Sequence, residues 1–229
     1  MSRQSMWLVV LCHSAGAAAL SPAPRVTVLD AVTDANHGSP DNCSTPVFRW
    51  FDAHSSEFTS VLDLGGGQGE KGDALARTQP RLEYSCVDLE TQGRCVAFDG
   101  KHLSAYANQS IDVVMSVFVL HHAGASTPSL LAEARRVARK YVVILDDLRA
   151  DTPLGKEEQL HHRGCDAEVS GSSTGGCIFR SSDEYMHTLF PAAGLKLLEH
   201  GDDEEMRDCM LSNRGYPYPV PRGFYVLRP

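Results

Sequence analysis

Short apolar runs and amphipathic stretches alternate along the chain after about residue 46. Runs of apolar and β-branched residues predict strands, and apolar residues at every third or fourth position predict helices. The run Ile111 to Phe118 is almost continuously apolar, which is typical of a strand buried on both faces. The predicted strands are 60–64, 84–87, 96–98, 111–118, 141–145, 195–199 and 223–227. The predicted helices are 47–54, 69–78, 128–139 and a stretch that follows a capping box at 181–184.

This alternation predicts an α/β protein with a doubly wound, mostly parallel sheet that ends in a final strand pair. Only 10 residues separate Asp88 from Asp99, at the ends of the second and third strands. A parallel crossover normally takes a dozen or more residues. The helix between these strands is therefore expected to be absent, or reduced to a turn over Thr91 to Arg94. Residues 148–180 are Gly- and Ser-rich and are predicted to be irregular.

The N-terminal region differs in composition from the rest. Residues 1–29 contain no Asp or Glu, and residues 33–46 are rich in Gly, Pro, Asn and Ser. We expect a leader and linker over 1–45, either a targeting peptide, a disordered segment or an element packed on the domain, and one domain over 46–229. The seven cysteines are irregularly spaced without a C-x-x-C pair. A disulfide framework is not expected, and Cys86 is predicted to be a reduced core thiol. A cytoplasmic or organellar location follows.

The net charge and the hydropathy of the chain limit the kinds of partner that it is expected to bind. The net charge is -8 and no basic run occurs, which argues against nucleic-acid binding. The apolar run 6–12 is far shorter than the ~20 residues of a membrane-spanning helix. A small molecule is the expected partner.

The segment Val61 to Glu70 reads V-L-D-L-G-G-G-Q-G-E and combines a strand, a glycine turn and the start of a helix. Such a corner binds nucleotides in open α/β sheets. Residues 67–72 also match G-x-G-x-x-G, with Asp88 at a suitable distance for a ribose, which would indicate NAD. Asp63, however, lies two residues before the first glycine, where a carboxylate would face an amine. The chain also has no separate substrate domain.

The motifs D-L-G-G-G-Q-G at 63–69, F-D-G at 98–100 and I-D-V-V-M-S-V-F-V-L-H-H at 111–122 occur together with the acid at 88. In this combination the chain resembles the class I S-adenosylmethionine-dependent methyltransferase family, over about 46–229. It is most similar to the small-molecule, ubiquinone/menaquinone-biosynthesis-like type. The resemblance implies a seven-stranded sheet with an antiparallel last strand and S-adenosylmethionine as the cofactor.

The resemblance also implies roles for residues. Asp63 would hold the methionine amino group, Asp88 the ribose hydroxyls and Asp99 the adenine amine, while Ser116 would lie near the sulfonium. Because the second crossover is short, Glu90 is a rival to Asp88 as the ribose acid. The implied cofactor-binding set is Asp63, Gly65, Gly66, Gly67, Gly69, Asp88, Leu89, Asp99, Gly100 and Ser116.

The candidate catalytic residues are His121 and His122, which follow the fourth strand at the expected mouth of the site. Either could be a general base, because an imidazole titrates near neutral pH. They could equally cap a turn or shape the pocket. Asp146 and Asp147 could contact an acceptor amine or be solvated strand-end acids. No metal is expected, because H-H-x-x-C at 161–165 with Cys177 does not have a zinc-site spacing.

The leading hypothesis is a monomeric enzyme that transfers a methyl group from S-adenosylmethionine to oxygen or carbon of a small molecule. The loops at 118–126, 147–180 and 201–222 would select that molecule. One alternative is a non-catalytic methyltransferase-like binding protein, suggested by the short 89–95 crossover. The other is an NAD-dependent oxidoreductase.

Overall fold

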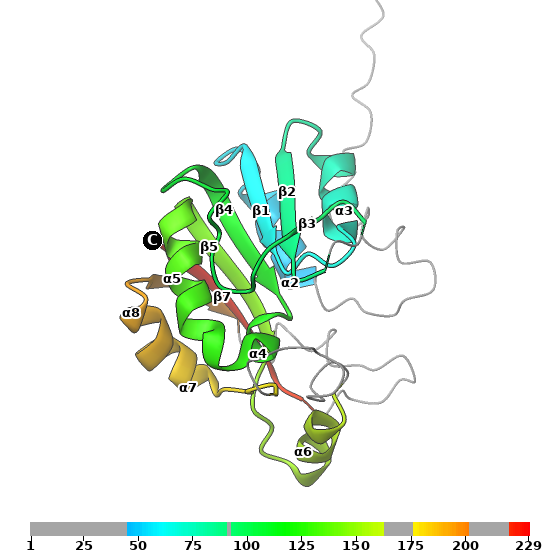
Figure 1. Cartoon of the computed structure of the whole chain (residues 1–229), viewed down its shortest axis with the longest axis vertical. Helices are drawn as coiled ribbons and strands as arrows, with labels where there is room; N and C mark the ends of the chain where they lie inside the picture. The colour runs from blue at the N-terminus through cyan, green and yellow to red at the C-terminus, as the bar shows by residue number, and fades with distance from the viewer. Residues whose placement is uncertain (1–44, 91–92, 163–175, 202–219) are drawn as a thin grey trace, which may run out of the picture.

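A seven-stranded sheet organises the protein (Figure 1). The computed structural model describes residues 45–90, 93–162, 176–201 and 220–229. The strand order is β3-β2-β1-β4-β5-β7-β6, and β7 runs antiparallel to its neighbours β5 and β6. The strands are β1 (Ser60–Leu64), β2 (Glu83–Asp88), β3 (Val96–Ala97), β4 (Ile111–Val117), β5 (Ala138–Asp147), β6 (Lys196–Gly201) and β7 (Arg222–Arg228). The predicted doubly wound sheet with an antiparallel last strand is confirmed.

Helices cover both faces of the sheet. One face carries α2 (Thr45–Ala53) and α3 (Glu70–Thr78). The other carries α4 (Leu120–Ala123), the 3-10 turn η2 (Gly124–Ser126), α5 (Thr127–Val137), α7 (Ser182–Glu184), the π-helical turn η3 (Tyr185–Leu189) and α8 (Phe190–Ala192). Helix α6 (Pro153–Leu160) stands away from the sheet, near the end of β5 (Figure 1).

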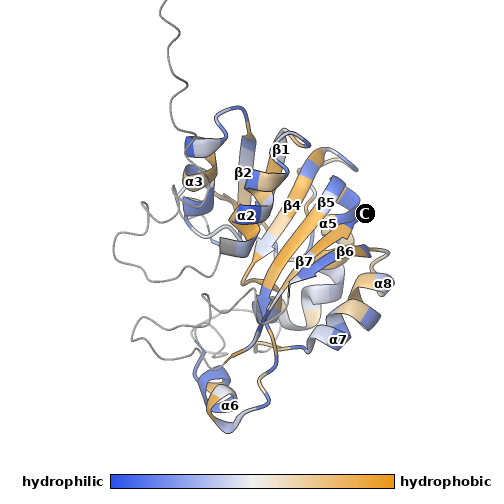
Figure 2. Cartoon of the chain, turned by 180° about the vertical axis from the view of Figure 1, so that it is seen from behind, coloured by the Kyte–Doolittle hydropathy of each residue, from blue (hydrophilic) through white to orange (hydrophobic). Residues whose placement is uncertain are grey.

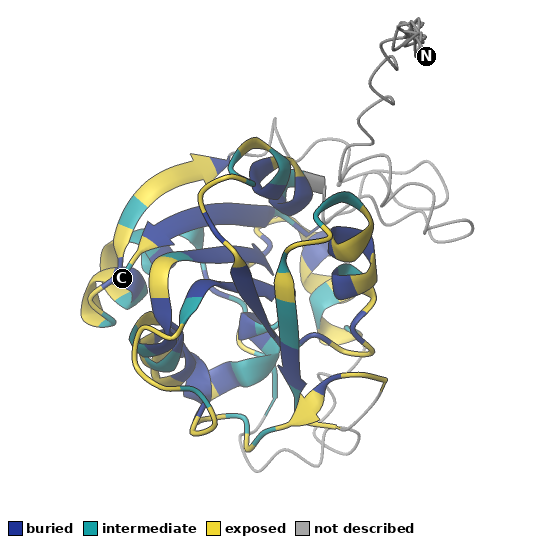
Figure 3. Ribbon diagram, turned by 90° about the horizontal axis from the view of Figure 1, so that it is seen from above, coloured by how far each residue is buried: buried dark blue, intermediate teal, exposed yellow. Residues whose placement is uncertain are grey.

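The core is split into two apolar layers by the sheet. Along β4, Val113 and Met115 pack toward α2 and α3, whereas Val114 packs toward α5. Figure 2 shows the apolar character of β4 and β5, and Figure 3 shows that the inner strands are buried while the margins are exposed. Because side chains alternate between the faces of a strand, each inner strand contributes to both layers. The carboxyl ends of the parallel strands are thereby held together at one edge.

Two element predictions were wrong. Residues 138 and 139 were expected to end a helix but begin β5, where Ala138 pairs with Ile111 and Arg139 forms an ion pair with Asp112. The segment 148–180, expected to be irregular, contains α6. The Thr152 hydroxyl accepts a hydrogen bond from the Gly155 N–H at 3.1 Å, and Pro153 occupies the first turn. Thr-Pro is a helix-start signal that the composition of the segment concealed.

The prediction of a reduced Cys86 was also wrong, because Cys86 and Cys95 form a disulfide. Val87 pairs with Val96 in the parallel β2–β3 ladder, so the preceding residues stand side by side, with their Cα atoms 4.7 Å apart. Cys177 is disulfide-bonded as well. The register that brings Cys86 to Cys95 depends on the short crossover, in which no helix occurs among the described residues.

The predicted leader and most of the predicted linker lie outside the described residues. Within the described ranges, no helix combines the length and the apolar character that a membrane crossing requires.

Candidate functional site

The glycine turn after β1 has backbone angles that residues with a side chain rarely adopt. Gly65, Gly67 and Gly69 have φ values of 75°, 59° and 90°, in the left-handed region. A Cβ atom at Gly65 would lie 2.4 Å from Val119 Cγ2, whereas a Cβ at Gly67 would meet nothing within 4 Å. The turn is therefore closed on the side of β4 and open at Gly67, where a ligand can approach the backbone.

Asp63 lies fully buried below this turn. Its Oδ2 accepts a hydrogen bond from the Tyr84 hydroxyl at 2.7 Å and lies 3.9 Å from Lys71 Nζ. Its Oδ1 has no hydrogen-bond partner among the described residues. Burial raises the pKa of Asp63, and the Lys71 charge and the Tyr84 hydrogen bond offset this only in part. A carboxylate oxygen in this position is suited to an amine.

Asp88, at the end of β2, lies against the glycine turn. Its Oδ2 accepts a hydrogen bond from the Gly67 N–H at 2.8 Å, and its Oδ1 accepts one from the Glu90 N–H at 3.4 Å. Asp88 is half-buried, whereas Glu90 is exposed beyond it. The geometry thus favours Asp88 over Glu90 as the acid beside a ligand on the turn.

The loops after β2 and β3 are neighbours. A Cβ atom at Gly100 would lie 2.8 Å from Leu89 Cδ2, and the Leu89 side chain is 59% exposed. Asp99 accepts hydrogen bonds from the Lys101 N–H at 2.8 Å and from the His102 N–H and ring, which form a tight turn. These hydrogen bonds lower the pKa of Asp99 to about 2, so it is charged at neutral pH. An exposed apolar side chain beside a fixed acid suits a flat, polar-edged ring such as adenine.

Ser116 lies at the end of β4 and pairs with Leu64 of β1, which directly precedes the glycine turn. The Ser116 side chain is buried, and its Oγ has no partner among the described residues. Phe118 follows with a φ of 58°, unusual for a residue other than glycine, while its N–H donates to the Leu145 carbonyl at 2.7 Å. Strained backbone of this kind is common beside active sites.

The histidine cluster, defined as His121, His122 and His162, lies beyond Phe118. His121 is fully buried, and its Nδ1 lies 2.7 Å from Asp146 Oδ1. The other Asp146 oxygen accepts a hydrogen bond from the Tyr185 hydroxyl at 2.7 Å. The His121 Nε2 lies 3.2 Å from His162 Nε2. Three elements, α4, the end of β5 and the end of α6, therefore meet at one imidazole.

The cluster also contacts the segment before α7. The Phe179 ring stacks on His121, with ring centroids 5.0 Å apart, and Cys177 Sγ lies 3.2 Å from His122 Nδ1. The buried Arg180 anchors this segment, because its guanidinium donates to the Thr127 hydroxyl at 3.0 Å and to the Gly124 carbonyl at 2.9 Å.

The three imidazoles differ in their proton affinity. Burial, together with its charged neighbours, lowers the pKa of His122 to about 4, and burial also lowers the pKa of His162. For His121, burial lowers the pKa but the negative charge and hydrogen bond of Asp146 outweigh it, so the net pKa is raised. His122 and His162 are therefore neutral at neutral pH, whereas His121 binds a proton more readily than a free imidazole does.

Asp146 and Asp147 are neither solvated nor directed at solvent. Asp146 is shared by His121 and Tyr185, and Asp147 forms a buried ion pair with Arg222, whose Nε lies 2.7 Å from Asp147 Oδ1. Arg222 also lies over the Phe118 ring, 4.7 Å from its centroid. Through these contacts the two carboxylates link elements at this edge of the sheet.

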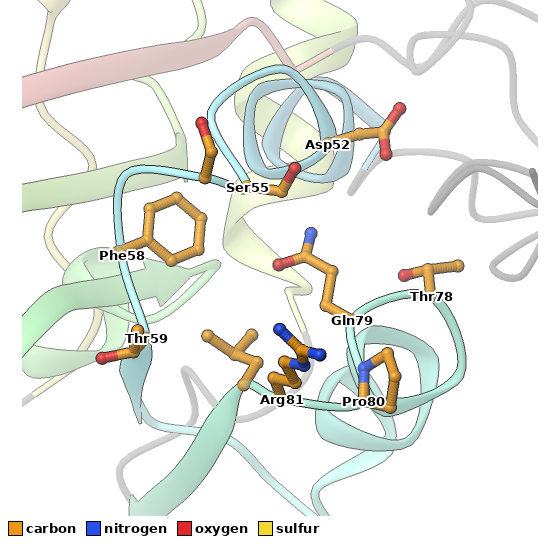
Figure 4. Close-up of a pocket in the computed structure, with 10 residues that line it drawn as sticks. Asp52, Ser55, Phe58, Thr59, Thr78, Gln79, Pro80 and Arg81 are labelled. Carbon is orange, nitrogen blue, oxygen red and sulfur yellow. The ribbon is translucent and has the colours of Figure 1, made fainter.

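A hollow of about 580 Å³ opens beside the cluster. Its lining is Arg149, Ala150, Lys156, Gln159, Leu160, Gly176, Cys177, Ile178 and Phe179. A second hollow, of about 340 Å³, lies at the opposite edge of the sheet, between the loop after α2 and the turn after α3 (Figure 4). It is remote from the glycine turn because it adjoins the amino ends of β1 and β2.

The sequence-predicted residues separate into two groups at one sheet edge: Asp63, the glycines, Asp88, Leu89, Asp99 and Gly100 around the turn, and His121 and His122 beyond Ser116. Trp50 and Phe51 of α2 are core residues and lie outside both groups. The residues that sequence reasoning missed are the partners: Tyr84 and Lys71 for Asp63, and Tyr185 and His162 for the Asp146–His121 pair. A tyrosine at the start of a strand and a histidine after a helix carry no signal of such contacts in the sequence.

Comparisons with known proteins agree with this geometry. Residues 62–145 match the family model described as a methyltransferase domain. No curated protein sequence matches the chain.

Several solved structures share the fold at low sequence identity. The Burkholderia thailandensis 1,6-didemethyltoxoflavin-N1-methyltransferase, solved with its substrate and S-adenosylhomocysteine, is 14% identical with a TM-score of 0.58, covering 82% of this chain and 78% of its own. A putative methyltransferase in a complex with the Haloferax volcanii Trm112 activator is 17% identical with a TM-score of 0.57, covering 86% and 93%. An S-adenosylmethionine-dependent methyltransferase from Archaeoglobus fulgidus is 14% identical with a TM-score of 0.56, covering 86% and 98%.

The matched segment 62–145 contains the glycine turn, Asp88, Asp99, Ser116 and both predicted histidines, and the protein shares its fold with these solved methyltransferases. Residues 62–145 are thus similar to methyltransferase domains, and the protein has the fold of these S-adenosylmethionine-dependent methyltransferases.

Proposed function

We propose that the protein transfers the methyl group of S-adenosylmethionine to a small molecule bound between the glycine turn and the histidine cluster. One observation carries the donor half of this proposal. The buried Asp63 presents an oxygen without a partner among the described residues, below a glycine turn that is open at Gly67. An unpaired buried carboxylate oxygen is costly unless a ligand compensates it, and the methionine amino group has the required charge and donors.

The other donor contacts follow from the order of the loops. Asp88 would meet the ribose hydroxyls, and Asp99 with Leu89 would meet the adenine ring. Ser116 would lie beside the sulfur. When bound, S-adenosylmethionine supplies an electrophilic methyl group, so the main task of the chain is alignment, which can contribute up to ~7–11 kcal/mol.

The acceptor half is proposed from the 580 Å³ hollow. Its walls include Phe179, Leu160 and Ile178, with the exposed cations Arg149 and Lys156 at its rim. We assign to it an acceptor with an apolar body and an anionic group. The toxoflavin-type substrate named for the Burkholderia neighbour supports a small ring compound in general, but not this particular substrate class. Oxygen or carbon remains the expected methylated atom.

An acceptor hydroxyl must also lose its proton. Burial, with the two neighbouring histidines, lowers the pKa of His122 to about 4, which leaves its ring neutral at neutral pH and makes it a weak base with a ring nitrogen that can accept a proton. We therefore keep the proton-accepting role within the histidine cluster, at His122 rather than at His121, whose two ring nitrogens are both engaged.

Two titrations test the donor half. The full-length protein is titrated calorimetrically with S-adenosylhomocysteine and, separately, with NAD. The proposal predicts binding of the first and none of the second; the reverse result would establish the oxidoreductase alternative. A methyl-transfer assay with methyl-labelled donor then compares aromatic carboxylates with their uncharged amides. Transfer to the carboxylates supports the acceptor class, whereas donor binding without transfer to any small molecule supports the non-catalytic alternative.

We further propose that the protein acts as a monomer without a protein activator. The complex of the Haloferax neighbour with Trm112 offers the contrary precedent. Light scattering of the purified active protein distinguishes the two: a mass near 24.9 kDa is expected.

A further inference from the structure

The three imidazoles of the histidine cluster converge on one point. One ring nitrogen from each of His121, His122 and His162 lies within 4.8 Å of the other two. The three residues come from two segments, α4 and the end of α6, that are 40 positions apart in the sequence.

The closest pair shows what the space between them can hold. His121 Nδ1 faces Asp146, which accepts a hydrogen bond and so fixes the Nδ1–H tautomer. His121 Nε2 and His162 Nε2 then face each other at 3.2 Å, and only a proton or a cation between them makes this approach favourable. Two nitrogen ligands of tetrahedral zinc, each at ~2.0–2.1 Å, are roughly 3.3–3.4 Å apart. The observed spacing therefore suits a metal as well as a proton.

The side chains around His121 are arranged as they usually are around a histidine that binds a metal. Ligating histidines usually donate their second N–H to a carboxylate, which orients the ring and raises its basicity. Here Asp146 occupies that position and is itself fixed by the Tyr185 hydroxyl at 2.7 Å. Phe179 stacks on the opposite side of the ring and restricts its rotation. The Tyr185–Asp146–His121 chain is buried throughout.

We infer that His121, His122 and His162 bind a divalent transition-metal ion, with Zn²⁺ as the preferred ion. Three imidazole ligands are the set that zinc uses at catalytic sites, where the fourth position is left to water or substrate. Cys177 lies beside His122 but is disulfide-bonded, so it is not counted as a ligand. The inference departs from the sequence prediction of no metal, because the local motif at 161–165 conceals a site formed across α4 and α6.

Such an ion would deepen the proposed function, although its binding does not depend on it. An ion held by these residues would lower the pKa of a coordinated hydroxyl and would polarise the acceptor. The imidazoles would then serve as ligands, and the metal would take over the proton-loss step assigned above to His122.

The test is a Co²⁺ titration of the full-length protein after treatment with a chelator, with the disulfides left intact. Co²⁺ replaces Zn²⁺ in tetrahedral nitrogen sites and its visible absorption reports that geometry. The variants are His162→Gln and His122→Gln, with His161→Gln as the matched control, since His161 is adjacent and exposed but outside the cluster. Wild type and H161Q are expected to bind a single equivalent, and H162Q and H122Q to bind about tenfold or more weakly.

Calorimetry in two buffers that differ in ionisation enthalpy adds a second readout. Binding at the cluster displaces the proton between the two Nε2 atoms, so proton release is expected in wild type. No Co²⁺ or Zn²⁺ binding by wild type, or equal binding by H162Q and H122Q, overturns the inference. Titration of the same variants with S-adenosylhomocysteine checks that they are folded, and it fails independently if the donor proposal is wrong.

Discussion

At the scale of single residues, Asp63 is the most informative side chain in the protein. It is fully buried, and burial raises its pKa despite Lys71 and Tyr84. A carboxyl group whose pKa is raised on folding stabilises the protein at low pH, and this contribution is lost as the pH rises through the raised value. At neutral pH the ionised Asp63 side chain therefore lowers the free energy of unfolding of the ligand-free protein. This is expected of a residue that serves binding rather than stability.

The first prediction follows from this destabilisation by the ionised Asp63 side chain. Asp63→Asn keeps the hydrogen bond from Tyr84 but removes the charge, so the ligand-free variant is expected to melt at a higher temperature than wild type at pH 7. Its affinity for S-adenosylmethionine is expected to fall roughly 10- to 100-fold, the worth of a charged hydrogen bond of ~1.5–3 kcal/mol.

Thermal melts with and without ligand measure both effects. Asp52→Asn is the matched control, because Asp52 lies at the opposite edge of the sheet, beside the hollow of Figure 4. A variant at Asp63 that melts lower than wild type and binds as well would remove Asp63 from the site.

Individual site residues were predictable to different degrees. Asp63 and the glycines stand in a contiguous strand–turn–helix pattern and Asp88 ends the next strand, so their positions in the fold could be predicted from the sequence. Tyr84 and Tyr185 could not be predicted as partners, because their contacts depend on the packing of elements far apart in the chain.

At the scale of elements, the edge strand β3 depends on its covalent link to β2. Only Val96 and Ala97 form its ladder, and Val96 is 61% exposed. The Cys86–Cys95 disulfide holds this edge, and the Arg94 N–H beside it donates to the Gln68 carbonyl in the glycine turn at 3.4 Å. The disulfide therefore helps to hold the glycine turn of the proposed donor site in place.

We predict that the double variant Cys86→Ala/Cys95→Ala is destabilised by about 2–3 kcal/mol, the loop-closure value for a short loop. Its affinity for S-adenosylhomocysteine is expected to fall several-fold because the turn loses this support. Urea unfolding measures the first effect and calorimetry the second. The double variant is preferred to a reductant, which would also reduce the disulfide of Cys177. Unchanged stability would show that the β2–β3 ladder suffices.

Asp112 links the amino ends of β1, β4 and β5. Its buried carboxylate accepts hydrogen bonds from the Thr59 N–H at 2.8 Å and from the Arg139 guanidinium at 2.6 and 2.9 Å. Burial raises the pKa of Asp112, but these hydrogen bonds outweigh it, and the net pKa lies below the ordinary 3.8. A lowered pKa means that the stabilisation is present above pH 3.8 and is lost as the pH falls through the folded-state value.

Asp112→Asn is therefore expected to lower the free energy of unfolding by ~1.5–3 kcal/mol at pH 7. The gap between variant and wild type should close as the pH falls below the ordinary value of 3.8. Urea titrations across that range measure it; a gap that stays constant with pH would assign the effect to packing rather than to charge.

Element prediction succeeded where periodicity was strong and failed where composition misled. The apolar run of β4 and the capping box at 181–184 were found, and the Ser181 hydroxyl accepts from the Glu184 N–H as that box requires. Helix α6 was missed because the segment 148–180 as a whole is rich in Gly and Ser, and the early start of β5 was missed because Arg139 and Lys140 are polar. These two residues extend the strand because both form ion pairs with Asp112 of the neighbouring strand β4.

At the scale of the whole molecule, the two halves of the proposed site lie side by side along the carboxyl edge of the parallel strands. In the proposed function, the loops after β1, β2 and β3 bind the donor, and the loops after β4 and β5, with the segment before α7, bind the acceptor. Ser116 and Phe118 lie between them. The donor half could be predicted because it is local in sequence. The acceptor half could not, because it is assembled from α4, α6 and Phe179 by tertiary packing.

The most direct test of the central claim is a crystal structure of the full-length protein with S-adenosylhomocysteine. We predict that the methionine amino group lies within hydrogen-bond distance of Asp63 Oδ1, the ribose beside Asp88 and the sulfur facing Ser116. A ligand bound elsewhere, or bound at the glycine turn while Asp63 Oδ1 stays unpaired, would contradict the account.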